Sequence, residues 1–252
     1  MAGLLSVDGI SVNFGGVQAL QNVSFSLGQG ELLGLIGPNG AGKTTAMRAI
    51  TGVVSPDAGS VLIKGTNVTR AKISDRVRLG LGMSQQLVKP FHAMSVIENV
   101  ILAAGYTKTR SPLAALMHCD RSHETTRSRE LLDLVGIGET ANASPAELPL
   151  GYLKRLEVAR ALALDPSLLL LDEPLAGLNH LEAAKLADTI KDLNNRGLSI
   201  ILIEHNLGEV MRICSRLVVL DNGRNLSEGD PQSVMSNVAV RAAYLGEEAV
   251  NA

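Results

Sequence analysis

A glycine-rich stretch at residues 37–45 has the residue types and spacing that bind phosphate groups. It fits the pattern G-x-x-x-x-G-K-[ST] and follows an apolar run at residues 31–36 that predicts a buried strand. Glycines let successive backbone N–H groups converge on phosphate oxygens, Lys43 adds a positive charge, and the Thr44 hydroxyl is a hard ligand suited to Mg²⁺. We therefore predict a nucleotide and Mg²⁺ site built from Gly37, Pro38, Asn39, Gly40, Ala41, Gly42, Lys43, Thr44 and Thr45.

Polar residues after two apolar runs form a second candidate group. Residues 168–171 are leucines that predict a buried strand, and Asp172 and Glu173 follow them directly. A second apolar run, residues 198–203, is followed closely by His205. Parallel sheets bind ligands at the carboxyl ends of their strands, and an unpaired buried charge is costly. Both groups of polar residues are therefore expected to bind a ligand or take part in catalysis. We predict that Asp172 holds Mg²⁺, that Glu173 polarises an attacking water, and that His205 contacts the terminal phosphate.

Two further candidates have ordinary structural alternatives. The pair Gln85 and Gln86 ends a strand predicted at residues 81–86, where an amide reaches a bound Mg²⁺ or the attacking water; the alternative is a solvated loop amide. Phe14 precedes a Gly-Gly pair and either stacks on a nucleotide base or packs into the core, as strand aromatics usually do. The residues alone leave both alternatives open.

The composition limits the classes of protein to which the chain belongs. Its 252 residues include 23 basic and 25 acidic side chains, a balance that argues against a nucleic-acid surface. No apolar run approaches the roughly 20 residues needed to span a bilayer, and the first residues lack the basic start of a signal peptide, so we expect a soluble chain. Cys119 and Cys214 are far apart, which favours a reducing cytoplasm. His118, Cys119 and His123 lack a repeated ligand spacing, so we expect no metal there.

The N-terminal part of the chain predicts strands followed by short helices. Apolar residues alternate over residues 5–27, which indicates antiparallel, half-buried strands. Residues 73–79 have the pattern of a short amphipathic helix, and we expect Arg76 and Arg78 to face outward from it.

From residue 89 the pattern changes from strands to helices. One helix begins with a capping box at residues 95–98, and others follow before the apolar strands resume. We therefore expect one α/β domain over residues 1–252. Its catalytic core comprises residues 1–88 and 150–252, and a helical insert comprises about residues 89–149.

These motifs, in this order, resemble those of the nucleotide-binding subunit of an ATP-binding-cassette (ABC) transporter, over nearly the whole chain. The chain looks most like the larger ATP-binding subunit of branched-chain amino-acid importers. That finer resemblance rests on residues 14–20, 94–100, 175–179, 203–206 and 243–247. It implies an α/β P-loop NTPase of ABC type, in which a mixed sheet core carries an N-terminal antiparallel β subdomain and an inserted α-helical subdomain.

The resemblance also implies a role for each candidate residue. It makes Phe14 the aromatic that stacks on adenine and Gln86 the glutamine that reaches Mg²⁺ and the attacking water. It makes Asp172 and Glu173 the Walker B pair, and His205 the switch histidine. Gln86 is preferred to the glutamine before it because the capping box then falls at the family's spacing.

Two motifs depart from the family pattern. The signature, usually L-S-G-G-Q, is L-P-L-G-Y at residues 148–152, so Pro149 offers neither a hydroxyl nor a backbone donor. In such ATPases each ATP lies between the phosphate loop of one subunit and the signature of the other, and we expect Gly151 to contact it. Asn179 replaces the aspartate that usually ends the loop after Walker B. We therefore expect a heterodimer with a second ABC ATPase whose signature is intact. The alternative is that Pro149 and Leu150 are tolerated variants and that both sites hydrolyse ATP alike.

The resemblance implies ATP and Mg²⁺ as cofactors, with two integral-membrane permease subunits and an external substrate-binding protein as partners. It implies a peripheral location on the cytoplasmic face of the inner membrane and no nucleic-acid partner. The favoured function is the ATP-hydrolysing motor of an importer of branched-chain or related amino acids. One alternative is a soluble ABC ATPase of DNA repair or translation, which the sequence disfavours because it has neither a long coiled-coil insertion nor a second cassette. The other is a nucleotide-binding regulatory subunit with weak hydrolysis; Glu173 and His205 argue against it, and the altered signature keeps it open.

Overall fold

Two β-sheets form the framework of the protein, and the computed structural model describes residues 3–84, 89–107 and 121–250. The smaller sheet is antiparallel and has the strand order β2-β1-β4-β5. Its strands are β1 (Leu5–Phe14), β2 (Val17–Leu27), β4 (Ala58–Ile63) and β5 (Thr66–Asn67). The antiparallel strands predicted at residues 5–27 are therefore confirmed.

The larger sheet has the order β10-β9-β3-β8-β7-β6, and its neighbouring strands are parallel except in the β9–β10 hairpin. Its strands are β3 (Leu32–Ile36), β6 (Leu81–Ser84), β7 (Leu168–Asp172), β8 (Ser199–Ile203), β9 (Arg216–Asp221) and β10 (Arg224–Gly229). Asn222 and Gly223, with φ of 45° and 73°, form the tight hairpin turn. The parallel strands place the phosphate loop, Glu173 and His205 at one edge of the sheet.

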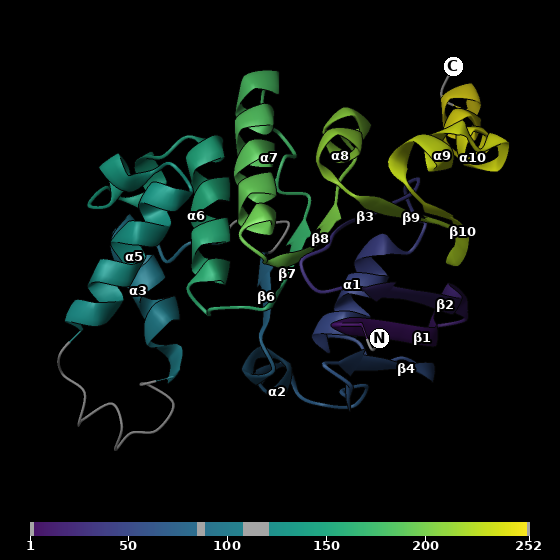
Figure 1. Cartoon of the computed structure of the whole chain (residues 1–252), viewed down its shortest axis with the longest axis horizontal. Helices are drawn as coiled ribbons and strands as arrows, with labels where there is room; N and C mark the ends of the chain where they lie inside the picture. The colour runs from purple at the N-terminus through teal and green to yellow at the C-terminus, as the bar shows by residue number, and fades with distance from the viewer. Residues whose placement is uncertain (1–2, 85–88, 108–120, 251–252) are drawn as a thin grey trace.

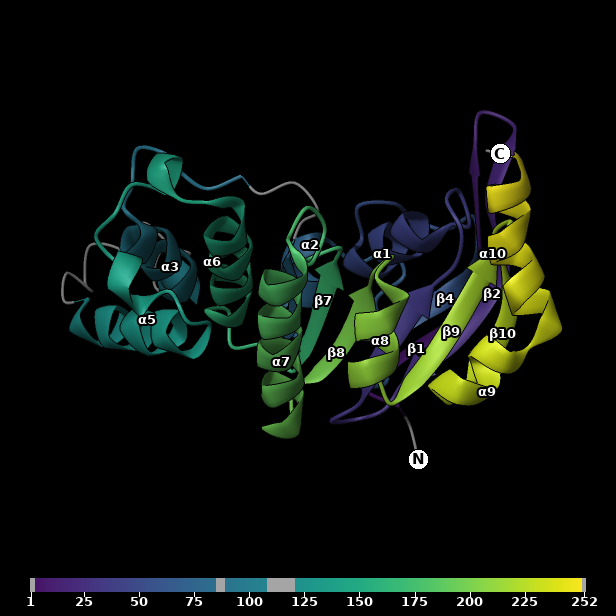
Figure 2. The ribbon, with the colours of Figure 1, turned by 90° about the horizontal axis from the view of Figure 1, so that it is seen from above.

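Helices lie on both sides of this sheet and at both ends of the molecule (Figures 1 and 2). They are α1 (Lys43–Thr51), α2 (Ile73–Arg78), α3 (Val96–Ala104), α5 (Ser122–Leu134), α6 (Leu150–Leu162), α7 (His180–Asn195), α8 (Leu207–Ile213), α9 (Pro231–Ser236) and α10 (Val238–Val250), with short 3-10 helices at Gly105–Thr107, Gly138–Thr140 and Pro145–Glu147. The capping box predicted for α3 is present at Ser95. Helix α6 contacts α3, α5 and β6, so it joins the helical region to the sheet. The domain boundaries near residues 88 and 149 stay a prediction.

Each face of the larger sheet is covered by its own hydrophobic core. Along β7, Leu169 and Leu171 belong to the core formed with α3, α5, α6, α7 and α8. Leu168 and Leu170 belong to the core formed with α1 and the smaller sheet. Figure 2 shows α7 and α8 on one side of the sheet and α1, β1 and β4 on the other. Because both faces are covered, a continuous run of leucines is the expected sequence for this strand.

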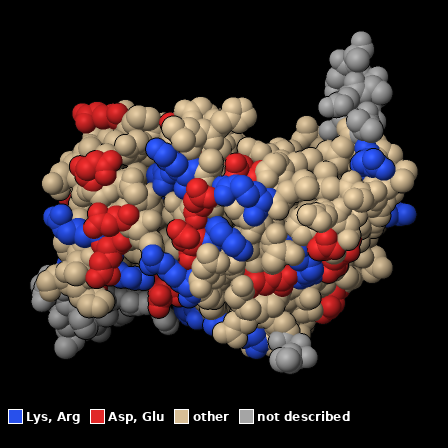
Figure 3. All heavy atoms as spheres, turned by 45° about the horizontal axis from the view of Figure 1, so that its top comes forward, with Lys and Arg blue, Asp and Glu red and all other residues tan. Residues whose placement is uncertain are grey.

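Charged side chains of both signs are interspersed on the face of the molecule that Figure 3 shows. Within the described parts of the chain, no helix combines the length and the apolar character needed to cross a membrane. The same residues contain no cluster of His, Cys, Asp and Glu side chains placed to hold a metal ion by themselves. His118 and Cys119 lie outside the described residues. The expectation that the protein has no nucleic-acid partner stays a prediction.

The predicted exposure of Arg76 is wrong. Its side chain is fully buried, whereas Arg78 on the same helix is exposed. The guanidinium group of Arg76 donates hydrogen bonds of 2.6 to 3.3 Å to four backbone carbonyl oxygens, which belong to Ala49, Ile50, Thr69 and Ala71. The first two lie in the last turn of α1, where carbonyls lack intrahelical partners and the helix dipole favours a cation. Arg76 therefore caps the far end of the helix that carries the phosphate loop.

Replacement of Arg76 by Met should lower the free energy of unfolding by about 3 kcal/mol or more, because several buried carbonyl oxygens lose their donors. Arg78→Met is the matched control, because this exposed side chain forms a surface ion pair with Asp75, worth about 1 kcal/mol or less. Urea denaturation followed by circular dichroism measures both variants. Equal losses in the two would contradict the capping role of Arg76.

Candidate active site

The phosphate loop joins β3 to α1 and holds its glycines in conformations that other residues rarely adopt. Gly37 and Gly42 have φ of 147° and 101°. Gly42 is the N-cap of α1, and a Cβ atom there would lie 2.9 Å from the carbonyl oxygen of Ala19. Lys43, the first residue of α1, is buried, and its Nζ donates to the carbonyl oxygens of Gly37 and Pro38 at 2.7 and 2.9 Å. The loop therefore brings an ammonium group and the N-terminus of a helix to one place.

A cavity of about 200 Å³ lies between this loop and the ends of two strands. It is lined by Ala19, Asn39, Gly40, Ala41, Gly42, Lys43, Thr44, Thr45, Glu173 and His205. Glu173 directly follows β7, His205 lies just after β8, and His205 Nε2 is 3.1 Å from Oε1 of Glu173. The fold therefore brings the predicted base and the predicted histidine together beside the phosphate loop.

Asp172, the last residue of β7, has the properties of a cation ligand. It is 3% exposed, and its Oδ1 atom has no hydrogen-bond partner among the described residues. Burial raises the pKa of Asp172 above its usual value, and the carboxylate of Glu173 adds to the rise. Thr44 lies half-buried in the first turn of α1, so its hydroxyl is a second hard oxygen near the loop. These residues fit a divalent cation such as Mg²⁺, and burial makes such a countercharge favourable.

Phe14 lies at the end of β1, paired with Val17 at the start of β2, and its side chain is 47% exposed. This exposure excludes the alternative of a core phenylalanine. Phe14 is not one of the residues that line the cavity described above, so its stacking on adenine stays a prediction. Gln85 and Gln86 lie outside the described residues, and the role of Gln86 stays a prediction as well.

The altered signature forms the beginning of α6. Pro149 is the N-cap and supplies no side-chain hydrogen bond, and Gly151 is buried in the first turn. A Cβ atom on Gly151 would lie 3.3 Å from Oε1 of Glu182 on α7. Glu182 in turn forms the capping box of α7 with Asn179, whose Oδ1 accepts the Glu182 N–H at 3.0 Å. Asn179 therefore has a structural role within the subunit, whereas contact of Gly151 with a nucleotide stays a prediction.

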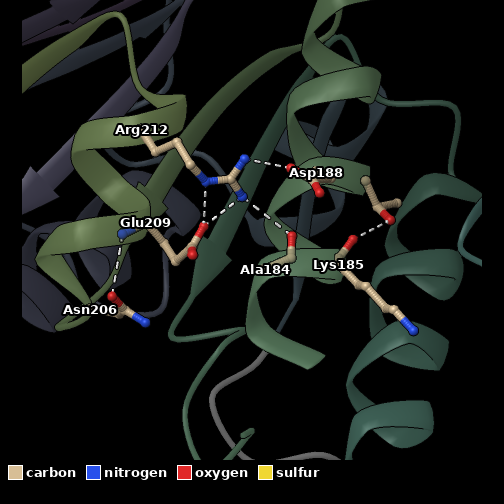
Figure 4. Close-up of polar contacts among 7 residues, drawn as sticks. Ala184, Lys185, Asp188, Asn206, Glu209 and Arg212 are labelled. Carbon is tan, nitrogen blue, oxygen red and sulfur yellow. Dashed lines mark hydrogen bonds and ion pairs between the residues drawn. The ribbon is translucent and has the colours of Figure 1, made fainter. Parts of the chain in front are cut away.

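The helix that follows His205 is anchored to α7 (Figure 4). Asn206 is the N-cap of α8, and its Oδ1 accepts the N–H of Glu209 at 3.2 Å. Arg212, in the last turn of α8, donates to Glu209 at 2.6 and 2.8 Å and to Asp188 of α7 at 2.5 Å. Because α7 begins shortly after β7, these contacts fix the connections that follow β7 and β8 relative to each other.

A family model described as the ABC transporter matches residues 20–176, which include the phosphate loop, Asp172 and Glu173. The chain belongs to the ABC transporter family. The resemblance inferred from its motifs is confirmed, and the chain is an ATPase of the ABC type. A second model, described as the branched-chain amino acid ATP-binding cassette transporter, matches residues 224–250.

Curated relatives and solved structures match this ABC ATPase over nearly its whole length. The high-affinity branched-chain amino acid transport ATP-binding protein LivG of Escherichia coli K12 is 37% identical, over 97% of this chain and 98% of the relative. The lipopolysaccharide export system ATP-binding protein LptB of Acidithiobacillus ferridurans is 33% identical, over 98% and 99%. A crystal structure of an ATP-binding cassette of an ABC transporter in its ADP conformation has a TM-score of 0.87 and 28% identity, over 98% of this chain and 100% of its own. The predicted fold class is therefore confirmed.

Two charged residues of this ABC ATPase that no motif indicates, Lys154 and Glu204, lie buried beside Glu173, with exposures of 6% and 3%. Lys154 Nζ donates to the carbonyl oxygen of Glu173 at 3.0 Å. Glu204 accepts the N–H of Leu175 at 2.5 Å and the N–H of His205 at 3.3 Å. Glu204 directly follows a buried strand, and this is the same signal that indicated Glu173. Lys154 gives no such signal, because charged residues on helices ordinarily face solvent.

Burial raises the pKa of Glu204 from 4.5 to about 7, because the loss of solvation outweighs the N–H groups of Leu175 and His205, which favour the ionised form. The carboxylate of Glu173 adds to the rise, and Lys154 opposes it. Burial also lowers the pKa of Lys154, and nearby carboxylates, led by Glu204, oppose that shift. Glu204 of the folded enzyme therefore changes its charge near neutral pH.

The folded state holds the Glu204 proton more tightly than the unfolded chain does. The stabilisation that protonated Glu204 gives the folded state is therefore fully present below about pH 4.5 and is lost as the pH rises through about 7. The free energy of unfolding of the wild type should fall relative to that of Glu204→Gln across this window, by up to about 3 kcal/mol. Urea denaturation at a series of pH values measures the difference. Glu130→Gln is the control, because that carboxylate is exposed in the folded state. Parallel profiles for the wild type and Glu204→Gln would refute the prediction.

Proposed function

We propose that this ABC ATPase is the ATP-hydrolysing subunit of an importer of branched-chain or related amino acids. The observation that carries this proposal is the match of residues 224–250, which span β10, α9 and α10, to the branched-chain amino acid transporter model. These elements lie at the end of the molecule opposite α3 and α5 (Figure 1). The 37% identity to LivG supports the same substrate class. LptB, at 33% identity, is named for lipopolysaccharide export, so the C-terminal match is what favours import of amino acids.

The proposed catalytic cycle uses the groups that surround the cavity. Residues 37–45 bind the triphosphate of ATP through the N–H groups of the loop and the first turn of α1, and Lys43 adds a point charge. Glu173 orients the attacking water and takes up its proton as general base. His205 contacts the terminal phosphate, and Phe14 stacks on adenine. The 3.1 Å contact between His205 and Glu173 beside the loop supports hydrolysis over simple nucleotide binding.

The residues proposed to hold Mg²⁺ are Thr44, Asp172 and Gln86. When bound, Mg²⁺ neutralises charge on the phosphate oxygens during phosphoryl transfer. Thr44 would supply its hydroxyl from the first turn of α1, and Asp172 would supply its carboxylate. The Oδ1 atom of Asp172, buried and without a hydrogen-bond partner among the described residues, is the observation that supports this assignment.

The functional unit is proposed to be a heterodimer with a second ABC ATPase whose signature is intact. Pro149 supplies neither a hydroxyl nor an N–H at the start of α6, while Gly151 keeps its N–H in the first turn. A composite site that contains this signature lacks one hydrogen-bond donor to the transition state. Such a loss raises the activation free energy of hydrolysis by about 3 kcal/mol. A homodimer would have this defect in both sites. Two permease subunits and an external substrate-binding protein complete the proposed complex, with this chain on the cytoplasmic face of the inner membrane.

Glu173→Gln in this chain should preserve ATP binding but slow hydrolysis by the complex about a hundredfold, because it removes the general base. The equivalent change in the partner ATPase should slow hydrolysis much less, because the partner's phosphate loop faces the altered signature. Phosphate release by the purified complex, with the base removed from one subunit at a time, measures both effects. Equal losses would contradict the asymmetric dimer, and normal release by Glu173→Gln would contradict the role of Glu173.

Uptake of labelled leucine tests the proposed substrate class. Cells that lack the chain should lose high-affinity leucine uptake, the wild-type gene should restore it, and the gene for Glu173→Gln should not, because import requires hydrolysis. Uptake of labelled glucose in the same cells is the control for general damage to the membrane. Normal leucine uptake without the chain would refute the substrate class and leave the ATPase assignment standing.

A further inference from the structure

Glu173 has an unusual backbone conformation that its neighbours hold in place. Its φ of 50° lies in the left-handed region, which residues other than glycine rarely adopt. Its N–H donates to the carbonyl oxygen of Ile203 in β8 at 2.9 Å, and its own carbonyl oxygen accepts from Lys154 Nζ at 3.0 Å. A strained conformation persists only where the surroundings impose it. Here β8 fixes one side of the residue and Lys154 fixes the other.

Lys154 is a costly group to bury, and carboxylates surround its ammonium group. An ammonium group is almost never fully buried unless it is paired, yet only 6% of Lys154 is exposed. The carboxylates of Glu204, Glu173, Asp172 and Glu157 all favour its charged form. Removal of one partner from such a buried set leaves the others uncompensated. Lys154 is therefore a hydrogen-bond donor to the backbone of Glu173 and also the countercharge of the acidic edge of the sheet.

Glu204 connects the two loops that carry the proposed base and the proposed histidine. Its Oε1 accepts the N–H of Leu175, in the loop after Glu173, at 2.5 Å. Its Oε2 accepts the N–H of His205 at 3.3 Å. Because the carboxylate is almost completely buried, water does not compete for these bonds. Glu204 therefore helps to set the spacing at which Oε1 of Glu173 and Nε2 of His205 meet, 3.1 Å apart.

We propose that Lys154 and Glu204 are a positioning pair that fixes Glu173 and His205 in the geometry needed for ATP hydrolysis. The inference rests on the roles proposed above for Glu173 and His205. Lys154 acts on the backbone of Glu173, and Glu204 acts on the loops that follow β7 and β8. Neither side chain lines the cavity beside the phosphate loop, so neither contacts ATP there. Loss of the pair should therefore slow turnover without weakening nucleotide binding.

Lys154→Met tests the pair, because Met keeps an unbranched apolar stem but removes the charge and the donor. In the purified transporter complex, kcat should fall about tenfold to a hundredfold, the range expected when a catalytic group is misplaced. The KM for ATP should change by less than about twofold, because binding groups are untouched. Lys154→Arg keeps the charge and the donors and should recover kcat to within about fivefold of the wild type. Unchanged kcat in Lys154→Met, or a loss of ATP affinity as large as the loss of kcat, would overturn the proposal.

Two further variants separate this inference from its alternatives. Lys185→Met is the matched control, because Lys185 is exposed on α7 and its side chain extends away from the contacts in Figure 4. It should keep the kcat and KM of the wild type. Glu173→Gln, measured in parallel, tests the proposed site itself. Slow hydrolysis by Glu173→Gln with normal hydrolysis by Lys154→Met would refute the positioning pair alone, and normal hydrolysis by Glu173→Gln would refute the role of Glu173.

A double variant keeps the test decisive if Lys154→Met fails to fold. Lys154→Met leaves Glu204 as a buried acid without its countercharge, whereas Lys154→Met with Glu204→Gln removes both charges. The double variant should bind ATP with wild-type affinity and hydrolyse it about tenfold or more slowly, and no more slowly than Lys154→Met where that protein folds, since members of one network are not additive. Wild-type turnover in the folded double variant would overturn the proposal.

Discussion

Negative charge concentrated at one edge of the larger sheet is the constraint around which the rest of this structure is arranged. Asp172, Glu173 and Glu204 come together at the ends of β7 and β8, and the nucleotide that an ABC ATPase binds is itself an anion. Repulsion among buried acids is offset only by nearby cations or by protonation. Lys154 supplies a cation from within the fold, Lys43 supplies one from the phosphate loop, and burial favours the proton on Glu204. A bound divalent cation would complete this balance.

Side-chain contacts to three helices hold the elements around the ends of β7 and β8 in place. Helix α1 presents its N-terminus to the cavity, and Arg76 caps the last turn at the opposite end of the helix. Helices α7 and α8, which follow the two acidic strand ends, are joined by Arg212 and Asp188. Arg76 supplies hydrogen-bond donors to carbonyl oxygens at a helix end. Arg212 and Asp188 link two helices that the chain otherwise connects through loops and a strand. The helices next to Glu173 and His205 are therefore held by side chains that do not line the cavity.

The sequence predicts well which polar residues lie together at the ends of β7 and β8, because its signals are local. Apolar runs define β7 and β8, and two adjacent acids at the end of β7, Asp172 and Glu173, have no obvious structural role. Asn222 with Gly223 indicates a hairpin turn whatever surrounds it. The prediction that Arg76 is exposed failed for a physical reason. An amphipathic pattern over six residues indicates which face of the helix is apolar, but it does not indicate which groups a long side chain can reach. Lys154 is not predictable for a similar reason, since Glu173, to which it donates, is distant in sequence.

The placement of Lys154 on α6 has a consequence for how two ATP sites in a dimer communicate. Lys154 is one turn beyond Gly151, so a rigid helix connects the backbone of Glu173 with the turn that faces the proposed opposite nucleotide. A displacement of that turn moves the ammonium group with it. If the α6 terminus binds nucleotide as proposed, thermodynamic linkage makes the effect reciprocal: a ligand bound there favours this conformation of Glu173 by the same free energy by which that conformation favours the ligand. Coupling between the two proposed sites then requires no additional element, because α6 is part of both.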